Sequence, residues 1–87
     1  MTNPNRFETI LATNKKDKKD RQVGYKVIIV TNANLNNESS ARIQKVISVN
    51  GEWKDYGPGT FFKYFETDKQ AAQWAYPHAK KLIAKLK

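Results

Sequence analysis

The fold is decided by residues 57–87, whose sequence is GPGTFFKYFETDKQAAQWAYPHAKKLIAKLK. Aromatic and β-branched residues follow a Gly-Pro-Gly turn signal, and this composition predicts a strand over about residues 59–66. The tetrapeptide TDKQ then has the form of a capping box, in which the Thr67 hydroxyl accepts from the Gln70 amide and the Gln70 side chain reaches back to the Thr67 amide. A helix is therefore predicted to begin directly after the strand.

The predicted helix, over about residues 68–86, carries one apolar stripe. Residues at three- and four-residue spacing form this stripe, namely Ala71, Ala75, Ala79, Leu82, Ile83 and Leu86. We expect the stripe to cover one face of the sheet to which the preceding strand belongs. Pro77 cannot donate to the carbonyl of Gln73, so a kink is predicted near Tyr76, and a second helix beginning at Pro77 is the alternative.

Three further strands are predicted upstream of this stretch. Residues 22–31 carry the densest β-branched run, which is typical of a central strand, and residues 41–49 resume the alternation of apolar and polar residues. Residues 6–13 also alternate and favour a strand over a short helix. Asn50-Gly51 is a strong turn signal that leads either to a tight hairpin or to a longer loop. The predicted class is α+β, with a three- to four-stranded, mostly antiparallel sheet and one C-terminal helix packed on one face.

The remaining segments are expected to be loops or a tail. Residues 1–5 read as a flexible tail, and residues 6–87 as a single domain. Residues 14–21, NKKDKKDR, contain no apolar side chain and are predicted to form a flexible, solvated loop. Residues 32–40 are rich in Asn and Ser, which favour turns over strand pairing.

Composition limits the classes of function. The chain has 87 residues, no cysteine and a formal net charge of +8, with a pI near 9.8. No disulfide can reinforce the core, and the positive charge attracts polyanions, of which nucleic acid is the commonest. We find neither a membrane-spanning run nor a signal-peptide pattern, so a cytoplasmic location is expected, and no membrane partner.

The sequence offers little that could support catalysis. His78 is the only histidine, and its place near the apolar stripe indicates a boundary residue with a backbone partner. Asp17 and Asp20 lie inside the lysine tract, where neighbouring cations neutralise them. One histidine, no cysteine and eight dispersed carboxylates do not build a usual metal site. We therefore expect no enzyme, no metal and no cofactor.

Cations and aromatic residues form the constellation that could bind nucleic acid. Phosphate contacts are expected from cations of the loop and of the strands, namely Lys15, Lys16, Lys18, Lys19, Arg21, Lys26, Arg42, Lys45, Lys54 and Lys63. Aromatic side chains left uncovered by the helix, Trp53, Tyr56, Phe62 and Tyr64, could stack on unpaired bases. The alternative for Phe62 and Tyr64 is a second minor core beneath the Asn-rich loop. Strict alternation puts Lys45 and Lys63 beside apolar residues, so a bulge or register change is expected near one of them.

A motif in the C-terminal part resembles known DNA-binding modules. Gly51-Glu52-Trp53, Phe65-Glu66-Thr67, Ala71 and Trp74-Ala75 follow the pattern G-x-W … F-x-T-x-x-x-A-x-x-W/A. This pattern is similar to that of integrase arm-type DNA-binding domains, in which a three-stranded sheet enters the major groove, and to the strand-turn-helix ending of WGR domains. The resemblance implies their fold and a sheet face that touches nucleic acid. Double-stranded RNA-binding domains carry a lysine pair where this helix begins with Asp68-Lys69, which favours DNA over RNA.

Two hypotheses follow from the sequence. The first is a small basic nucleic-acid-binding protein, with DNA preferred over RNA, in which cations bind phosphate and aromatics stack. The second is an interaction module or inhibitor that docks on an acidic protein partner, for which strand addition at a sheet edge is one route. A monomer and a homodimer that buries the exposed aromatics are both compatible with the sequence.

Overall fold

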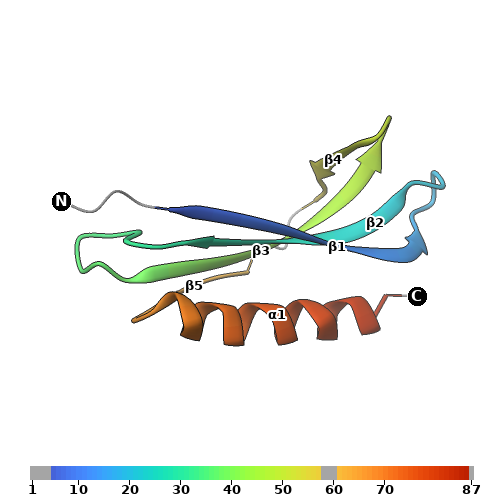
Figure 1. The fold of residues 1–87 in the computed structure, drawn as a ribbon. Coiled ribbons are helices and arrows are strands. Elements are labelled where there is room, and N and C mark those ends of the chain that lie inside the picture. Colours follow the sequence, from blue (N-terminus) through green and yellow to red (C-terminus); the bar gives the residue numbers. More distant parts are fainter. Residues whose placement is uncertain (1–4, 58–60, 87) are drawn as a thin grey trace.

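All strands of the structure join one antiparallel sheet, and a helix lies across one of its faces (Figure 1). The computed structural model describes residues 5–57 and 61–86. Its elements are β1 (Arg6–Lys16), β2 (Gln22–Val30), β3 (Ser39–Val49), β4 (Glu52–Asp55), β5 (Phe61–Phe65) and α1 (Asp68–Ala84). The predicted α+β class is confirmed. Within the described residues, no helix has the length and hydropathy needed to cross a bilayer.

The strand β3 organises the sheet. On one side it pairs along its length with β2, which lies between β1 and β3 as an interior strand. On its other side, the first half of β3 pairs with β5, from Ser39 opposite Phe65 to Ile43 opposite Phe61. The second half pairs with β4, where Val49 lies opposite Glu52. The short strands β4 and β5 therefore share one edge of β3, which local sequence patterns did not indicate.

Two strands are longer than predicted. The alternating pattern of the first strand is observed, and β1 extends to Lys16 through an irregular register after Ala12. The strand β3 begins at Ser39, inside the segment that was expected to be a loop. Both serines at its start are buried, because pairing with β2 and β5 satisfies their backbone groups and covers their side chains.

The turns around the sheet use residues that tolerate positive φ. Asn50 and Gly51 have φ values of 53° and 82° and form a tight two-residue hairpin between β3 and β4, which decides the question that the sequence left open. In the loop before β3, the Asn34 side-chain oxygen accepts from the amides of Asn36 and Glu38 at 3.0 and 3.1 Å. The Asn-rich loop is thus held by its own side chains.

Asn5, near the N-terminus, and the turn before β5 were both assigned a structure in the sequence analysis. Asn5 was expected to belong to a flexible tail; its carbonyl accepts from the Thr31 amide at 2.9 Å, and its amide donates to the Thr31 side-chain hydroxyl at 3.1 Å. These two bonds attach Asn5 to the end of β2, and the expected flexible tail stays a prediction for residues 1–4, which lie outside the described residues. The same holds for the Pro-Gly part of the turn and the expected start of the strand at residues 58–60.

The helix begins as predicted, with one change in its cap. The Thr67 hydroxyl accepts from the Gln70 amide at 3.1 Å, as a capping box requires. The Gln70 side chain reaches back to the amide of Glu66, at 3.1 Å, instead of the amide of Thr67. A single helix runs through Pro77, so the alternative of a second helix beginning there is wrong. The kink near Tyr76 stays a prediction.

The core lies between the helix and the sheet. Ala71, Ala75 and Ala79 are fully buried and face Val27 and Ile43, which are also fully buried. Three small side chains at four-residue spacing let the helix backbone approach the sheet closely. The larger apolar residues of the stripe, Leu82, Ile83 and Leu86, pack at the border of this core.

Because the alanine stripe sets the distance between the helix and the sheet, we predict that Ala75→Leu destabilises the protein by about 1–3 kcal/mol, the usual range for overpacking. The matched control is Ala84→Leu, an exposed position on the same helix, which should change stability little. Urea unfolding followed by circular dichroism measures both. Equal midpoints for the two variants would show that the helix does not pack as described.

Candidate functional site

One face of the sheet has no helix on it, and we call it the open face. Phe61 and Phe65 of β5 point to the helix, where their rings lie 4.9 and 5.5 Å from those of His78 and Trp74. Strand alternation therefore puts their neighbours Phe62 and Tyr64 on the opposite side. In Figure 1 the helix lies below the sheet, and the hairpin of β3 and β4 rises from its upper side. The open face is thus bounded by this hairpin at one end.

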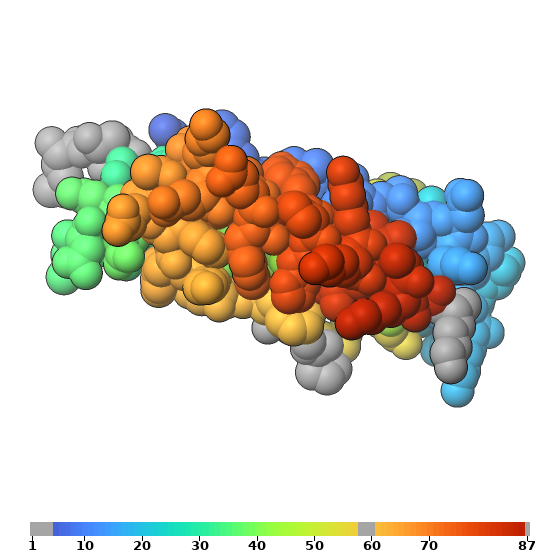
Figure 2. All heavy atoms as spheres, turned by 90° about the horizontal axis from the view of Figure 1, so that it is seen from below, coloured from blue at the N-terminus to red at the C-terminus, as the bar shows by residue number. Residues whose placement is uncertain are grey.

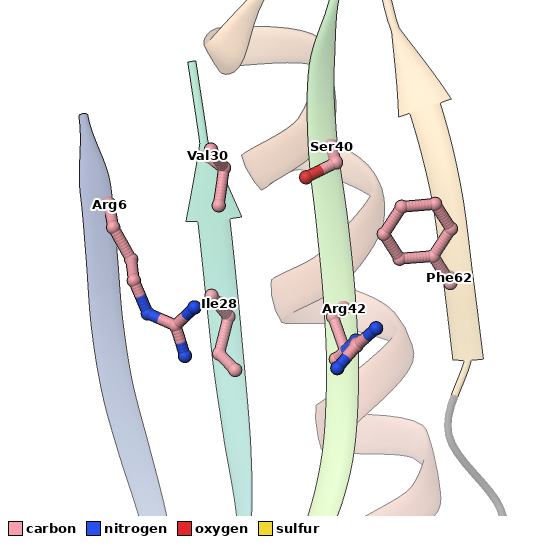
Figure 3. A pocket seen from close by; sticks show the side chains of 6 residues that line it. All are labelled: Arg6, Ile28, Val30, Ser40, Arg42 and Phe62. Atoms are coloured by element: carbon pink, nitrogen blue, oxygen red, sulfur yellow. The ribbon is translucent and has the colours of Figure 1, made fainter. Parts of the chain in front are cut away.

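A shallow hollow lies on the open face (Figure 3). Its volume is about 140 Å³, and the residues that line it come from four strands, namely Arg6, Ile28, Val30, Ser40, Arg42 and Phe62. Ile28 and Val30 supply an apolar floor on β2, while the two arginines and the Phe62 ring rise around it. The hollow thus combines an apolar floor with two guanidinium groups and one aromatic ring at its border.

A row of three side chains, Arg42, Phe62 and Tyr64, lies at one side of the hollow. The Arg42 guanidinium lies 5.5 Å from the centre of the Phe62 ring, directly across the ladder of β3 and β5. The Phe62 ring meets Tyr64 edge-on at 5.0 Å. Phe62 and Tyr64 remain 47% and 43% exposed, so the alternative that they form a second core is wrong. The row leaves ring surface and a guanidinium available to a ligand.

Some cationic side chains of the open face form ion pairs with carboxylates. Lys26 pairs with Asp55 at 3.1 Å and lies 4.0 Å from Glu8, and Arg6 pairs with Glu8 at 2.9 Å. Among the described residues Arg42 forms no ion pair, and its contact is with the Phe62 ring. Lys26 was predicted to bind phosphate, but its charge is largely compensated where it lies. Arg42 is the predicted cation that the open face presents without a counter-charge.

Trp53 packs at the far end of the open face. The indole ring lies over Gly24, where an added Cβ would come within 3.1 Å of it and within 3.0 Å of the Leu11 carbonyl oxygen. Trp53 is therefore half-buried, and a glycine is needed beneath it. This ring was expected to be free for stacking, but it holds the β4 hairpin against the sheet.

The lysine-rich loop is more ordered than the sequence suggested. Asp17 accepts from the amides of Lys19 and Arg21 at 3.0 and 2.8 Å, and its carboxylate lies 2.7 Å from the Arg21 guanidinium. The predicted phosphate contact from Arg21 is thus compromised, because its charge is paired and its side chain is only 29% exposed. The lysines of this tract, Lys15, Lys16, Lys18 and Lys19, are exposed.

The remaining predicted residues lie away from the hollow. Tyr56, which is 37% exposed, has Arg21 at 5.7 Å and Lys45 at 5.4 Å from its ring centre. Lys54 is exposed on β4, and Lys63 follows the alternation of Phe61 and Phe65 towards the helix side, 5.4 Å from the Phe65 ring. The register of β3 with its three partners is regular through Lys45 and Lys63, so the expected bulge near one of them is wrong.

Four residues that line the hollow, Arg6, Ile28, Val30 and Ser40, were not predicted to be binding residues. Arg6 was taken only as the start of a strand, and Ser40 as part of a loop. The alternation of β1 could have identified Arg6, since it shares a face with Glu8 and Ile10, opposite Phe7. Ser40 enters the site because β3 begins earlier than its apolar pattern does. His78 meets the rings of Phe61 and Trp74 in place of the backbone partner that was expected.

Comparison of the chain with protein-family models, with curated proteins and with solved structures finds no match. In the described part of the chain, no group of three or more His, Cys, Asp or Glu side chains is placed to hold a metal ion. The site is therefore interpreted from its own geometry.

The loop carboxylate gives a prediction about pH. Hydrogen bonds from the Arg21 side chain and from backbone amides lower the pKa of Asp17 below its ordinary value of 3.8. Because folding lowers this pKa, the stabilisation of the loop is complete at neutral pH and is lost as the pH falls through the lowered value. We expect Asp17→Asn to speed hydrogen exchange at the Lys19 and Arg21 amides already at neutral pH.

Nuclear magnetic resonance measures this exchange residue by residue. The matched control is Asp20→Asn, whose carboxylate lies 3.5 Å from Lys16 and accepts no bond from the loop amides described above. Its φ of 65° also suits asparagine. If both variants changed exchange equally, Asp17 would not be the residue that orders the loop.

Proposed function

We propose that this chain is a small nucleic-acid-binding protein that binds single strands on its open face. The observation that carries the proposal is the row of Arg42, Phe62 and Tyr64, which leaves ring surface and an uncompensated guanidinium beside an apolar hollow. Stacking on aromatic side chains and contacts from arginine are the two interactions that bind unpaired bases and phosphates.

Each part of the row has a separate role in this proposal. Bases stack on Phe62 and Tyr64, whose rings are nearly half exposed. Arg42 binds the adjacent phosphate, and Arg6, across the hollow, exchanges its contact with Glu8 for a second phosphate. In a duplex the base faces are already stacked on one another, so this surface favours unpaired strands.

Net charge supports the proposal at longer range. The formal charge of +8 draws a polyanion to the molecule, and the exposed lysines of the loop extend the basic surface beyond the sheet. This attraction does not depend on base stacking. It should therefore act on single strands and duplexes alike, whereas the row on the open face adds affinity for single strands.

The first test is a titration of fluorescent DNA and RNA oligonucleotides, single-stranded and duplex, at two salt concentrations. We expect tighter binding of single strands, and a log affinity that falls with log salt by roughly 0.7 per neutralised phosphate. An abasic oligonucleotide of the same length should bind more weakly because it offers no rings. Equal affinity for abasic and normal strands would contradict the role of stacking, and no binding at low salt would remove the whole proposal.

The second test changes the row itself. Phe62→Leu should weaken single-strand binding by about fivefold or more, the lower end of one lost stacking contact. Arg42→Ala should weaken it and reduce the salt dependence by about one phosphate. The controls are Phe61→Leu, the neighbouring ring on the helix side, and Lys80→Ala, an exposed cation on the helix. Equal effects of the paired variants would place the interface elsewhere.

A further inference from the structure

The strand β1 is a free edge of the sheet. Among the described residues it pairs with β2 alone. The Thr31 amide donates to the Asn5 carbonyl, and the register continues with Arg6 opposite Val30. Because bonded and non-bonded pairs alternate in an antiparallel ladder, the backbone groups of Arg6, Glu8 and Ile10 point away from β2. An edge that presents unpaired backbone groups is ready to accept another strand.

An apolar groove runs beside this edge on the helix side. The helix packs chiefly on β2, β3 and β5, and it meets β1 at its margin, where the Thr9 and Tyr76 hydroxyls lie 3.0 Å apart and Leu11 packs against the core. The groove has a volume of about 430 Å³, and its lining residues include Phe7, Thr9, Ile29, Ala72 and Tyr76. Phe7 is 56% exposed at its border. In Figure 2, which views the helix side, β1 lies along one margin of the helix and β5 along the other.

The charged side chains of β1 can pair with the opposite charges of β1 in a second copy of the chain. When two copies of β1 lie antiparallel about a two-fold axis at Phe7, Arg6 of each copy faces Glu8 of the other. Moving the axis to Glu8 places two glutamates opposite each other, which is unfavourable. Moving it to Thr9 leaves Arg6 opposite Ala12 and Glu8 opposite Ile10, with no charge partner. Only the axis at Phe7 pairs both charges.

We propose that two copies of this chain associate through their β1 edges, antiparallel and centred on Phe7. Arg6 and Glu8 then exchange backbone hydrogen bonds with the second copy, because these are the residues whose groups point outward. The two Phe7 rings meet as a non-hydrogen-bonded pair, in which side chains come closest, and cover the borders of both grooves. A second copy fits better than an acidic strand, which would place a carboxylate against Glu8.

Dimerisation would also join the two open faces. Arg6 lines the hollow and lies on the edge strand, so the hollows of both copies would flank the two-fold axis. The association itself does not require nucleic acid. It can therefore be tested in the absence of any ligand, and its failure would leave the proposed binding function untouched.

The experiment measures the molar mass of the full chain by light scattering coupled to gel filtration. We expect twice the chain mass of 10.0 kDa. Arg6→Glu alone places acids opposite acids, and Glu8→Arg alone places bases opposite bases, so each should give monomers. The double variant restores both pairs and should restore the dimer. Lys80→Glu changes the net charge as Arg6→Glu does, but on the helix, and should remain dimeric.

Several results would overturn the proposal. A wild-type chain that stays monomeric up to its solubility limit would do so, as would a dimer that survives both single swaps. Circular dichroism of the single variants checks that they fold, which is expected because an exposed ion pair such as Arg6 and Glu8 contributes little to stability. A double variant that stays monomeric while folded would also contradict the predicted pairing.

Cross-linking tests the position of the axis directly. The chain has no cysteine, so one introduced thiol can pair only with its copy. The Cα atoms of a non-hydrogen-bonded pair lie about 4.5 Å apart, within the range that a disulfide spans. Phe7→Cys should therefore form a covalent dimer on mild oxidation, and Thr9→Cys should not. The reverse result would place the axis at Thr9 and overturn the charge-paired arrangement.

Discussion

The structure depends on the contact between the alanine stripe of the helix and the middle of the sheet. Ala71, Ala75 and Ala79 are fully buried against β2 and β3, and their small side chains bring the helix close to Val27 and Ile43. One helix of 17 residues can shield only one face of a sheet. The other face must be stabilised by its own side chains, which is why it combines ion pairs, a packed indole and exposed rings.

The strands β4 and β5 share one edge of β3, and this arrangement shapes the open face. Because β4 and β5 pair with consecutive halves of the same strand, the β4 hairpin can rise from the sheet while β5 stays in contact with the helix. Trp53 closes over Gly24 at the raised end, and Phe62 lies beside Arg42 at the other end. The open face is thus closed at one end and hollowed at the other.

Local patterns predicted the fold class, four of the strands (β1, β2, β3 and β5) and the helix with its Thr67 cap, because each depends on residues close in sequence. They could not predict that β4 and β5 share an edge, since pairing partners are set by tertiary packing. The same reason explains why the contacts of two predicted site residues could not be foreseen. Lys26 meets Asp55 across three strands, and Trp53 meets Gly24 from a different hairpin, neither of which has a signal in the sequence.

Positive charge alone does not distinguish one face of this molecule from another. Lysines lie on the loop, on β4 and along the helix, so the positive field surrounds much of the molecule. Carboxylates then reduce it locally, with Asp17 holding Arg21, Asp55 holding Lys26 and Glu8 holding Arg6. Such a field draws a polyanion without orienting it. In the proposed binding of nucleic acid, orientation would come from groups that one face presents, which on the open face are the rings of Phe62 and Tyr64 with the guanidinium of Arg42 beside them.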